Sequence, residues 1–282
     1  MVSNSRKSAF SGQLAVITGG ASGIGRALAA ALRGGGARVV LLDVNEAQLA
    51  ATARELSCRG EPLDVTDAAA VEAAVAAIEA RDGPIDLFVN NAGVCQTGEA
   101  HRFTPGDWRR LLDVNIRGVV HGVQAVYPRM VARGRGHILN IGSIAGLFPT
   151  AGQVSYVTSK FAVVGLSQSL RAEGADYGVK VSVACPGIID TPMRRGLSAV
   201  GVDDSSMRAL LPAGLQVDRC AQAILRGVAR DQAIILIGHD ARILALLQRV
   251  SPALGGWINA RAIRWLRRRL GAARPERYAP SG

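Results

Sequence analysis

The sequence predicts one α/β domain built around a doubly wound parallel sheet, followed by a basic helical extension. The chain has 282 residues, and the 49% that are hydrophobic suffice for one substantial core. Short runs rich in β-branched residues alternate with Ala-rich stretches of helical character. The short runs are almost continuously apolar, as expected of parallel strands covered by helices on both faces. Right-handed connections between such strands give a doubly wound sheet.

The elements follow one another in a regular strand and helix alternation, with Gly and Pro at the helix ends. Strands are expected at Leu14 to Thr18, Arg38 to Asp43, Ile85 to Asn90, His137 to Gly142, Val179 to Cys185 and Ala233 to Ile237. Helices are expected at Gly25 to Leu32, Asp67 to Ala80, Pro105 to Val131, Ser155 to Tyr177 and Val217 to Arg230.

The chain divides at about residue 240. Residues 1–240 are expected to form the α/β domain, and residues 241–282 a helical basic extension. Within the domain, residues 188–215 are predicted to be a substrate loop, because Met193 to Pro212 has weak periodicity between a strand end and a helix.

The net charge of +11 is concentrated in the extension. From Trp257 onward there are seven Arg and one Glu, so this segment carries +6 and the preceding residues only +5. The chain has no aromatic-rich basic stripe and no recognition-helix motif, so no nucleic-acid partner is predicted.

Cysteine, histidine and hydropathy patterns exclude several classes of protein. The four cysteines (Cys58, Cys95, Cys185 and Cys220) lack CxxC spacing, and the four histidines are scattered, so no metal site or disulfide framework is predicted. No apolar run reaches the ~18 residues of a membrane span. The first residues lack the apolar core of a secretion signal, so a cytoplasmic location is expected.

A glycine-rich turn follows the first strand and leads directly into a helix. Its glycines allow a tight turn, close approach of backbone N–H groups to a pyrophosphate, and close packing of the helix on the sheet. The helix N-terminus adds partial positive charge. The sequence therefore predicts a dinucleotide site, with candidate cofactor-binding residues Thr18, Gly19, Ser22, Gly23, Ile24 and Gly25.

Asp43 ends the second strand, 18 residues after Gly25. A carboxylate there can accept hydrogen bonds from both hydroxyls of the adenosine ribose and would repel a 2′-phosphate. No Arg or Lys lies between Gly19 and Gly25 or directly after Asp43, so NAD is predicted in preference to NADP. The alternative is that Asp43 merely caps a helix starting near Asn45.

Tyr156 and Lys160 stand four residues apart on a predicted helix, so their side chains project from one face and can meet. Alone, this spacing is weak, because exposed pairs of this kind are common. Here it follows a strand that ends at Ser143, whose hydroxyl could lie beside the phenol.

Taken together, these motifs resemble those of the single-domain short-chain dehydrogenase/reductase family, which has the Rossmann fold. The resemblance covers residues 10–240, without a departure in the motifs compared. They are Thr18 to Gly25, Asp64-Val65, Asn90 to Gly93, Asn115, Ser143, Tyr156-x-x-x-Lys160, and Pro186-Gly187 with Thr191.

The resemblance implies four catalytic residues. Tyr156 would be the general acid/base, and Lys160 would favour its phenolate and hold the nicotinamide ribose. Ser143 would orient the substrate oxygen, and Asn115 would hold a water that links Lys160 to solvent.

The resemblance also implies further cofactor contacts. For Asn90 to Gly93, the alternative is that the Asn side chains mainly fix the turn and the sheet. For Asp64, the alternative is a helix cap before Thr66 and Asp67. The implied cofactor residues are Asp64, Val65, Asn91, Ala92, Gly93, Tyr156, Lys160, Pro186, Gly187, Ile189 and Thr191.

The expected function is interconversion of a hydrophobic secondary alcohol and its ketone, with a terpenoid, steroid or polyketide-like substrate. The residues expected beside the nicotinamide are nearly all apolar: Ile144, Ala145, Leu147, Phe148, Val154, Ile188, Met193 and Leu197. The alternative is a non-catalytic dinucleotide-binding scaffold or redox sensor. The resemblance further implies a homotetramer, or a dimer, packed through helices around Trp108 to Met130 and Tyr156 to Tyr177.

The extension contains a predicted amphipathic helix from Trp257 to Leu270. A basic helix of this kind can lie in a membrane interface, with Arg drawn to anionic lipid. The alternative, slightly favoured, is that its apolar face packs on the chain's own body or on a neighbouring subunit. The apolar face comprises Ile258, Ala262, Ile263, Trp265, Leu266 and Leu270, and the opposite face Arg261, Arg264, Arg267 and Arg268.

Overall fold

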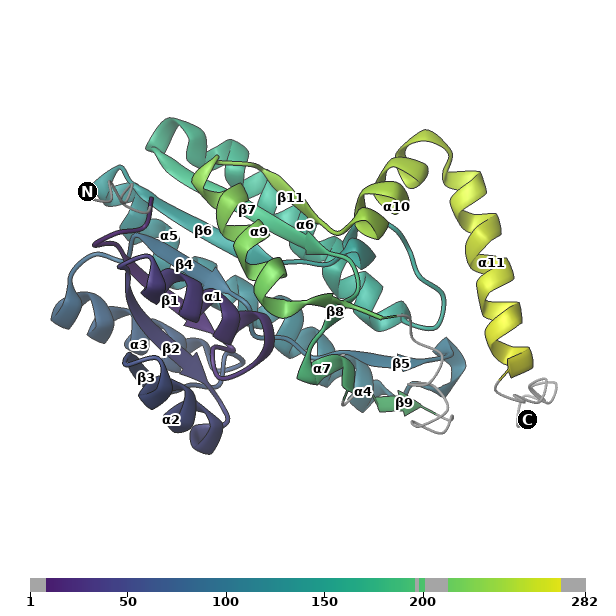
Figure 1. The fold of residues 1–282 in the computed structure, drawn as a ribbon, viewed down its shortest axis with the longest axis horizontal. Helices are drawn as coiled ribbons and strands as arrows, with labels where there is room; N and C mark the ends of the chain where they lie inside the picture. The colour runs from purple at the N-terminus through teal and green to yellow at the C-terminus, as the bar shows by residue number, and fades with distance from the viewer. Residues whose placement is uncertain (1–8, 196–197, 201–212, 270–282) are drawn as a thin grey trace, which may run out of the picture.

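The computed structural model describes residues 9–195, 198–200 and 213–269. Its centre is a parallel sheet of seven strands with the order β11-β7-β6-β4-β1-β2-β3 (Figure 1). The strands are Leu14–Thr18 (β1), Arg38–Asp43 (β2), Arg59–Pro62 (β3), Leu87–Asn90 (β4), Gly136–Ile141 (β6), Val179–Pro186 (β7) and Ile234–Ile237 (β11).

The strand order reverses between β1 and β4, which are hydrogen-bonded neighbours. From β1 the chain builds outward through β2 to β3, and from β4 it builds the other way through β6 and β7 to β11. In open parallel sheets, the crevice at the carboxyl ends of the strands beside such a reversal is where ligands bind. The doubly wound Rossmann fold predicted from the sequence is therefore confirmed.

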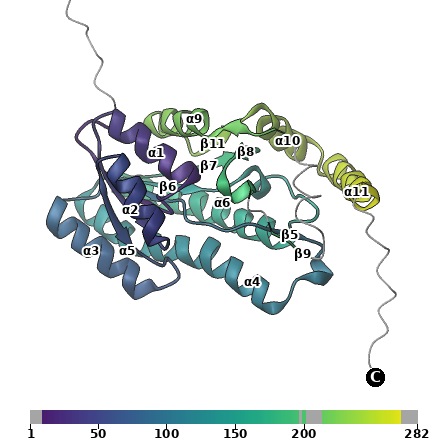
Figure 2. The ribbon, with the colours of Figure 1, turned by 60° about the horizontal axis from the view of Figure 1, so that its bottom comes forward.

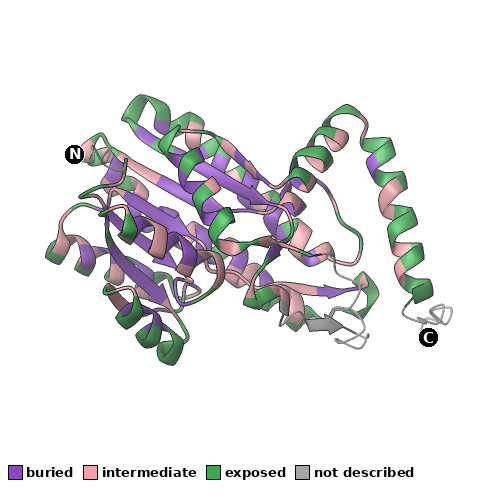
Figure 3. Ribbon diagram, viewed as in Figure 1, coloured by how far each residue is buried: buried purple, intermediate pink, exposed green. Residues whose placement is uncertain are grey.

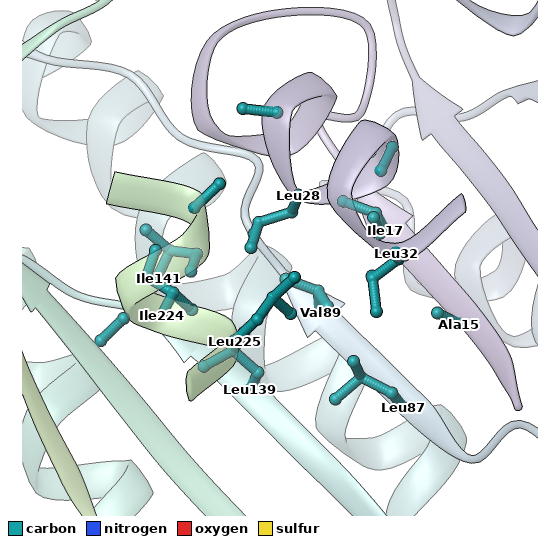
Figure 4. Packing of buried hydrophobic residues seen from close by; sticks show 14 of the residues in the cluster. Ala15, Ile17, Leu28, Leu32, Leu87, Val89, Leu139, Ile141, Ile224 and Leu225 are labelled. Carbon is teal, nitrogen blue, oxygen red and sulfur yellow. The ribbon is translucent and has the colours of Figure 1, made fainter. Parts of the chain in front are cut away.

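Helices cover both faces of the sheet, and each face has its own apolar core (Figure 2). On one face, Leu28, Leu32, Ile224 and Leu225 pack over residues of β1, β4 and β6 (Figure 4). This face carries Gly23–Gly34 (α1), Glu46–Glu55 (α2) and Val217–Ala229 (α9). The other face carries Ala68–Asp82 (α3), Gly118–Arg133 (α5) and Val154–Gly174 (α6), with Pro105–Leu112 (α4) leading into α5.

The expected helix from Pro105 to Val131 is interrupted. Between α4 and α5, Asp113–Arg117 form a π-helical turn, which contains the buried Asn115. A π turn inserts one extra residue into the helix and frees a backbone carbonyl from its usual partner, and it often marks a functional site.

The expected substrate loop lies largely outside the described residues. Its described parts are Ile189–Asp190 (β8), Pro192–Arg195 (α7), Ser198–Val200 (β9) and Leu215–Gln216 (β10). β8 pairs with β10, and β9 pairs with Gln96–Gly98 (β5). Leu197 is outside the described residues. Short 3-10 turns occur at Ala100–Arg102, Ile144–Gly146 and Ala175–Tyr177.

After β11 the chain forms two further helices, which we call the C-terminal arm: His239–Val250 (α10) and Pro252–Arg269 (α11). α11 lies at the periphery of the molecule, on the side of β5 (Figures 1 and 2). The predicted helix is present, but the predicted division of its faces is wrong. Trp265, assigned to the apolar face, lies on one side of the helix with Arg261, Arg264 and Arg268, whereas Arg267 forms an ion pair with Glu99.

The residues that seat α11 on the body are spaced four apart along one side of the helix: Gly255 beside Phe148, Asn259 bonded to Pro149, Ile263 near Gly152, and Arg267 paired with Glu99. Three of these four residues are a glycine or polar (Gly255, Asn259 and Arg267), so a hydropathy pattern does not identify this side of the helix as the packed one. Leu270, also assigned to the apolar face, is outside the described residues.

Candidate active site

The glycine turn between β1 and α1 leaves no room for side chains. Gly19 has φ +62° and Gly23 has φ +54°, in the region that favours glycine. A β-carbon on Gly19 would lie 2.7 Å from the Cα atom of Ala92, and one on Gly25 would collide with the carbonyl of Gly19. The turn therefore keeps the backbone bare at the N-terminus of α1, as close approach to a pyrophosphate requires.

Thr18 and Asn91 hold this turn against the end of β4. The Thr18 hydroxyl accepts hydrogen bonds from the N–H groups of Asn91 (3.0 Å) and Ala92 (3.1 Å). The Asn91 amide donates to the carbonyls of Thr18 (3.0 Å) and Gly19 (2.8 Å). The Asn91 side chain thus fixes the turn, which was the structural alternative stated above. Its neighbour Asn90 donates to Asn140 within the sheet.

An open cavity of about 420 Å³ lies over the N-terminus of α1. Ser22, the N-cap residue, is exposed there and makes no side-chain cap bond. The lining residues are Ala21, Ser22, Gly23, Arg26, Asp43, Asn45, Gln48, Asp190, Pro192 and Val217. The cavity joins the glycine turn to the end of β2, so it has the position expected for the adenosine half of a dinucleotide.

Asp43 accepts hydrogen bonds from the N–H groups of Ala21 (2.9 Å) and Asn45 (3.0 Å). The N-cap of α2 is Asn45, whose side chain accepts from the N–H of Gln48. The capping role considered for Asp43 therefore belongs to Asn45. Arg26, which no sequence motif marks, also lines the cavity and forms an ion pair with Glu55.

Asp64 and Val65 lie in the turn after β3. Asp64 is exposed and accepts from the N–H (2.9 Å) and hydroxyl (2.8 Å) of Thr66. The cap of α3 is Asp67, not Asp64. Val65 is buried, and its carbonyl is 2.9 Å from Nδ1 of His121. Asp64 therefore shapes a turn without capping the helix.

Tyr156 and Lys160 lie one turn apart on α6, as their spacing predicts. Nζ of Lys160 is 5.5 Å from the centroid of the Tyr156 ring and donates to the carbonyl of Ile141 (2.9 Å) at the end of β6. Ser143 follows β6, and its hydroxyl accepts from the N–H of Ala145 (3.1 Å). The ends of β6 and α6 thus bring the hydroxyl, the phenol and the ammonium to one place.

Burial dominates the pKa values at this place. It raises the pKa of Tyr156, with a further increase from Cys95, against a hydrogen bond with Ser143 that lowers it. Burial lowers the pKa of Lys160 to about 8, against the nearby Cys95 and Cys185. Burial also raises the pKa of each thiol to about 12, so both cysteines are neutral near pH 7. No sequence motif marks these two thiols as part of the site.

Asn115 is fully buried in the π-helical turn. Its side-chain oxygen accepts a hydrogen bond from the backbone N–H of Val94 (2.8 Å). Its side-chain N–H group donates to the backbone carbonyl of Val94 (2.9 Å) and to the hydroxyl of Ser159 (3.1 Å). Ser159 in turn donates to the carbonyl of Tyr156 (2.7 Å). Asn115 therefore ties the π turn to the segment after β4 and to α6, and Ser159 is a further member of the site that had no motif to reveal it.

The segment after β7 reaches across to the glycine turn. A β-carbon on Gly23 would lie 3.7 Å from Thr191 and from Pro192, so these residues stand over the N-terminus of α1. A β-carbon on Gly187 would collide with the carboxylate of Asp240, which accepts from the N–H of Ile188 (2.9 Å). Pro186 and Gly187 are therefore held by the C-terminal arm, and Ile189 is buried in the core.

Some residues expected beside the nicotinamide are placed differently. Ala145 and Phe148 are 3% and 4% exposed, so they belong to the interior rather than to an open wall. Ile188 and Met193 are exposed, as a substrate-facing position requires. Ile144, Leu147 and Val154 are half-buried.

Within residues 9–195, 198–200 and 213–269, no group of three or more His, Cys, Asp or Glu residues is arranged to hold a metal ion. None of the helices in these ranges is long and apolar enough to cross a membrane.

Comparison with known proteins places this site in a family. A family model described as short chain dehydrogenase matches residues 13–200. The protein SadH of Mycobacterium tuberculosis is 37% identical over 254 residues, which cover 86% of this chain and 92% of SadH. The 3-oxoacyl-(acyl-carrier-protein) reductase FabG of Escherichia coli is 34% identical over 241 residues, 83% of this chain and 96% of FabG.

A solved structure agrees with these relatives. The crystal structure of a short chain dehydrogenase/reductase from Burkholderia phymatum in complex with NAD has a TM-score of 0.79 and 30% identity, and the match covers 87% of this chain and 96% of that one. The chain therefore belongs to the short-chain dehydrogenase/reductase family of oxidoreductases.

Proposed function

We propose that this oxidoreductase uses NAD to interconvert a hydrophobic secondary alcohol and its ketone, with Tyr156 as general acid/base. The observation that carries the proposal is the convergence of the Ser143 hydroxyl, the Tyr156 phenol and the Lys160 ammonium, with Nζ 5.5 Å from the phenol ring. This convergence lies at the carboxyl end of the sheet, on the same side as the bare glycine turn.

The glycine turn fits a dinucleotide, because a β-carbon at Gly19 or Gly25 would fill the space beside the backbone. In the proposal, the N–H groups at the start of α1 bind the pyrophosphate, with the exposed Ser22 beside them. Asp43 accepts from the ribose hydroxyls, which favours NAD over NADP. The pairing of Arg26 with Glu55 supports this preference, since it engages the cation that could otherwise meet a 2′-phosphate.

The remaining cofactor residues have supporting roles in the proposal. Thr18, Asn91 and Ala92 hold the turn, and Gly93 leaves space beside Asn115. Asp64 and Val65 lie on the adenine side. Pro186, Gly187, Ile189 and Thr191 form the segment that closes over the glycine turn. Bound NAD would supply the carbon that accepts or gives the hydride.

Tyr156 moves the proton at its phenol oxygen. Burial raises its pKa, so the phenol keeps its proton near neutrality and can donate it to a carbonyl oxygen during reduction. Oxidation requires the phenolate, which nearby positive charge favours. Lys160 supplies such charge, because its pKa of about 8 leaves it mostly protonated at pH 7.

Ser143 and Asn115 complete the proposed catalytic set. The Ser143 hydroxyl orients and polarises the substrate oxygen beside the phenol. Asn115 holds the π turn in place, and the carbonyl freed by that turn can hold a water that connects Lys160 to solvent. A non-catalytic scaffold would not require this set, and all four residues are present and assembled.

The substrate side is apolar. Ile188 and Met193 are exposed at the described end of the substrate loop, and Ile144, Leu147 and Val154 are half-buried near Ser143 and Tyr156. A lipophilic secondary alcohol of the terpenoid, steroid or polyketide type suits such surroundings better than a sugar, which needs more hydrogen-bonding groups.

We also propose a homo-oligomer packed through α5 and α6. On α6, Phe161 is 42% exposed and stands one turn from Gly165, beside which a β-carbon would meet nothing within 4 Å. An exposed aromatic next to a flat glycine surface suits close approach of a second helix.

A panel of lipophilic secondary alcohols, assayed with NAD by the absorbance of NADH, tests the proposed function. We expect turnover of at least one compound class, a lower rate with sugars, and loss of turnover in Tyr156→Phe. Tight binding of NAD without turnover of any alcohol, or of any ketone with NADH, would instead support the scaffold or sensor.

A further inference from the structure

Exposed hydrophobic side chains gather on the C-terminal arm. Of the eleven large hydrophobic residues exposed in the described part of the chain, six lie on α10 and α11. Figure 3 shows that α11 is exposed along most of its length and that α10 is a mixture of exposed and half-buried residues. Concentrated apolar exposure of this kind marks a contact with something outside the chain. The six are Ile243, Leu246, Val250, Leu254, Trp257 and Trp265.

The tryptophans of α11 face away from the body. The helix is seated through its other side: Gly255 lies against Phe148, Asn259 donates to the carbonyl of Pro149, and Arg267 pairs with Glu99. Trp257 is 56% exposed and Trp265 is 49% exposed. Packing on the chain's own body therefore explains one side of α11, and among the described residues no other element packs on the tryptophan side.

Three arginines stand between and beside the two tryptophans. With Ile258 and Ala262, these five residues line one open hollow of about 500 Å³, so they share one side of the helix; we call the five the Trp-Arg face: Trp257, Arg261, Arg264, Trp265 and Arg268. The guanidinium of Arg261 lies 5.0 Å from the ring of Trp257. In the described part of the chain, none of the three arginines forms an ion pair.

The charge on this face decides between its possible partners. α11 has no acidic residue, and the arm's one carboxylate, Asp240, is directed to the N–H of Ile188. A second copy of the chain docked symmetrically on the same face would set arginines against arginines, which is destabilising. An anionic bilayer offers phosphate groups to the arginines and an interfacial layer to the tryptophans.

We propose that the Trp-Arg face docks α11 in the plane of an anionic membrane surface. The arginines contact lipid phosphates, and the indole rings lie at the level of the headgroups. α11 also contacts the segment that follows Ser143, through Phe148, Pro149 and Ala151. Docking therefore brings the proposed substrate site close to lipid. This consequence rests on the proposed function, whereas docking itself does not.

Co-sedimentation with vesicles tests the docking, with full-length protein and without NAD or alcohol. Vesicles of phosphatidylcholine alone are compared with vesicles containing about 30% phosphatidylglycerol, at about 20 mM and about 300 mM salt. We expect binding to the anionic vesicles at low salt, weaker binding at high salt, and little binding to phosphatidylcholine alone. Because the assay needs no turnover, its failure and a failure of the proposed function are separate results.

Two variants with matched controls locate the contact. Reversing Arg261, Arg264 and Arg268 to Glu should weaken binding at least about 100-fold, since each Arg near such a surface contributes about 1 kcal/mol. The control reverses Arg219 and Arg226 on α9 and its C-cap residue Arg230, with the same change in net charge. Trp257→Ala with Trp265→Ala should weaken binding about 10-fold, whereas Tyr177→Ala, another exposed aromatic, should not.

The position of the indoles provides an independent measurement. In a Trp108→Phe background the two remaining tryptophans are both on α11, so their fluorescence reports this face alone. We expect quenching by lipids brominated on the acyl chains. Absence of vesicle binding, equal losses in the controls, or equally strong binding to heparin without dependence on the tryptophans would overturn the proposal. So would a fall in oligomeric mass in the Trp-Arg variants, which would assign the face to a second copy.

Discussion

The glycine turn after β1 and the Trp-Arg face of α11 are both surfaces to which we assign an external partner, but they are built in opposite ways. At the turn, the backbone is the binding surface, and side chains at Gly19 and Gly25 are excluded by contacts with Ala92 and Gly19. On α11, one side of the helix is seated on the body, and the side chains of the opposite side form the surface. A backbone surface constrains residue type at fixed positions and appears as a motif, whereas a side-chain surface constrains only the general chemistry.

The largest expected effect is the loss of turnover when the phenol of Tyr156 is removed. Tyr156→Phe keeps the ring beside Lys160 and removes only the phenol oxygen. We expect kcat to fall by about 10² to 10⁴, the usual contribution of general acid–base catalysis, with the Kd for NAD changed less than about twofold. Steady-state kinetics and NAD titration measure both. Retention of more than a few per cent of kcat would remove Tyr156 from the mechanism and leave the glycine turn as a binding site only.

The same contrast explains what the sequence could predict of the fold. Strands such as Leu14–Thr18 are fully buried and therefore almost continuously apolar, so they stand out in the sequence. β3, by contrast, was not predicted, because Arg59–Pro62 is an edge strand without a large apolar side chain. It is defined by its pairing with β2. The π turn at Asn115 was also missed, since it depends on contacts with Val94 and Ser159 far along the chain.

The candidate site likewise contains residues that a local sequence pattern marks and residues that only the fold brings together. Tyr156 and Lys160 were predicted because four-residue spacing on a helix is a local property. Cys95 and Cys185 belong to distant segments and reach Lys160 only through the order of strands in the sheet. Asp240 reaches Gly187 and Ile188 because β11 lies beside β7. No local pattern marks these residues, so their place at the site required the structure.

Protein stability should depend on pH through His137 in the sheet, and not through His239 in the C-terminal arm. Burial lowers the pKa of His137 on β6 to about 4, below the ~6.5 of an unfolded histidine. Between these values the unfolded state binds more protons, so stability rises with pH across this window and is lost as the pH falls. The loss should approach about 3 kcal/mol at pH 4 relative to pH 7.

Urea unfolding of His137→Gln at several pH values measures this contribution. We expect a shallower loss between pH 6.5 and 4 than in the wild type, because the variant has no imidazole to protonate on unfolding. His239→Gln, at the exposed start of α10, is the matched control and should keep the wild-type slope. Identical slopes in the wild type and His137→Gln would show that burial of this ring does not depress its pKa.

The preference for NAD over NADP tests the role of Asp43 beside the glycine turn. If Asp43 accepts from the ribose, kcat/KM should favour NAD over NADP by at least about 10-fold, or about 1.4 kcal/mol, and Asp43→Ser should shrink the ratio. Asp43→Asn should act similarly, since it removes the charge but keeps an acceptor for the N–H of Ala21. Asp67→Ala removes the α3 cap, away from the cavity, and should lower stability by about 1 kcal/mol without changing the ratio. If both Asp43 variants kept the wild-type preference for NAD over NADP, Asp43 would only stabilise the turn.

Asp240 connects the two regions, and its replacement should have the smallest effect. Its carboxylate accepts from the N–H of Ile188 and fills the space above Gly187, so the arm steadies the segment that closes over the cofactor. Asp240→Ala should weaken NAD binding about fivefold, because a partly exposed hydrogen bond contributes about 1 kcal/mol. Asp240→Asn keeps an oxygen acceptor and should lose less. Isothermal titration with NAD measures both variants. Equal affinities in wild type and Asp240→Ala would mean that the arm contacts the cofactor segment without positioning it, and the two surfaces would then be independent.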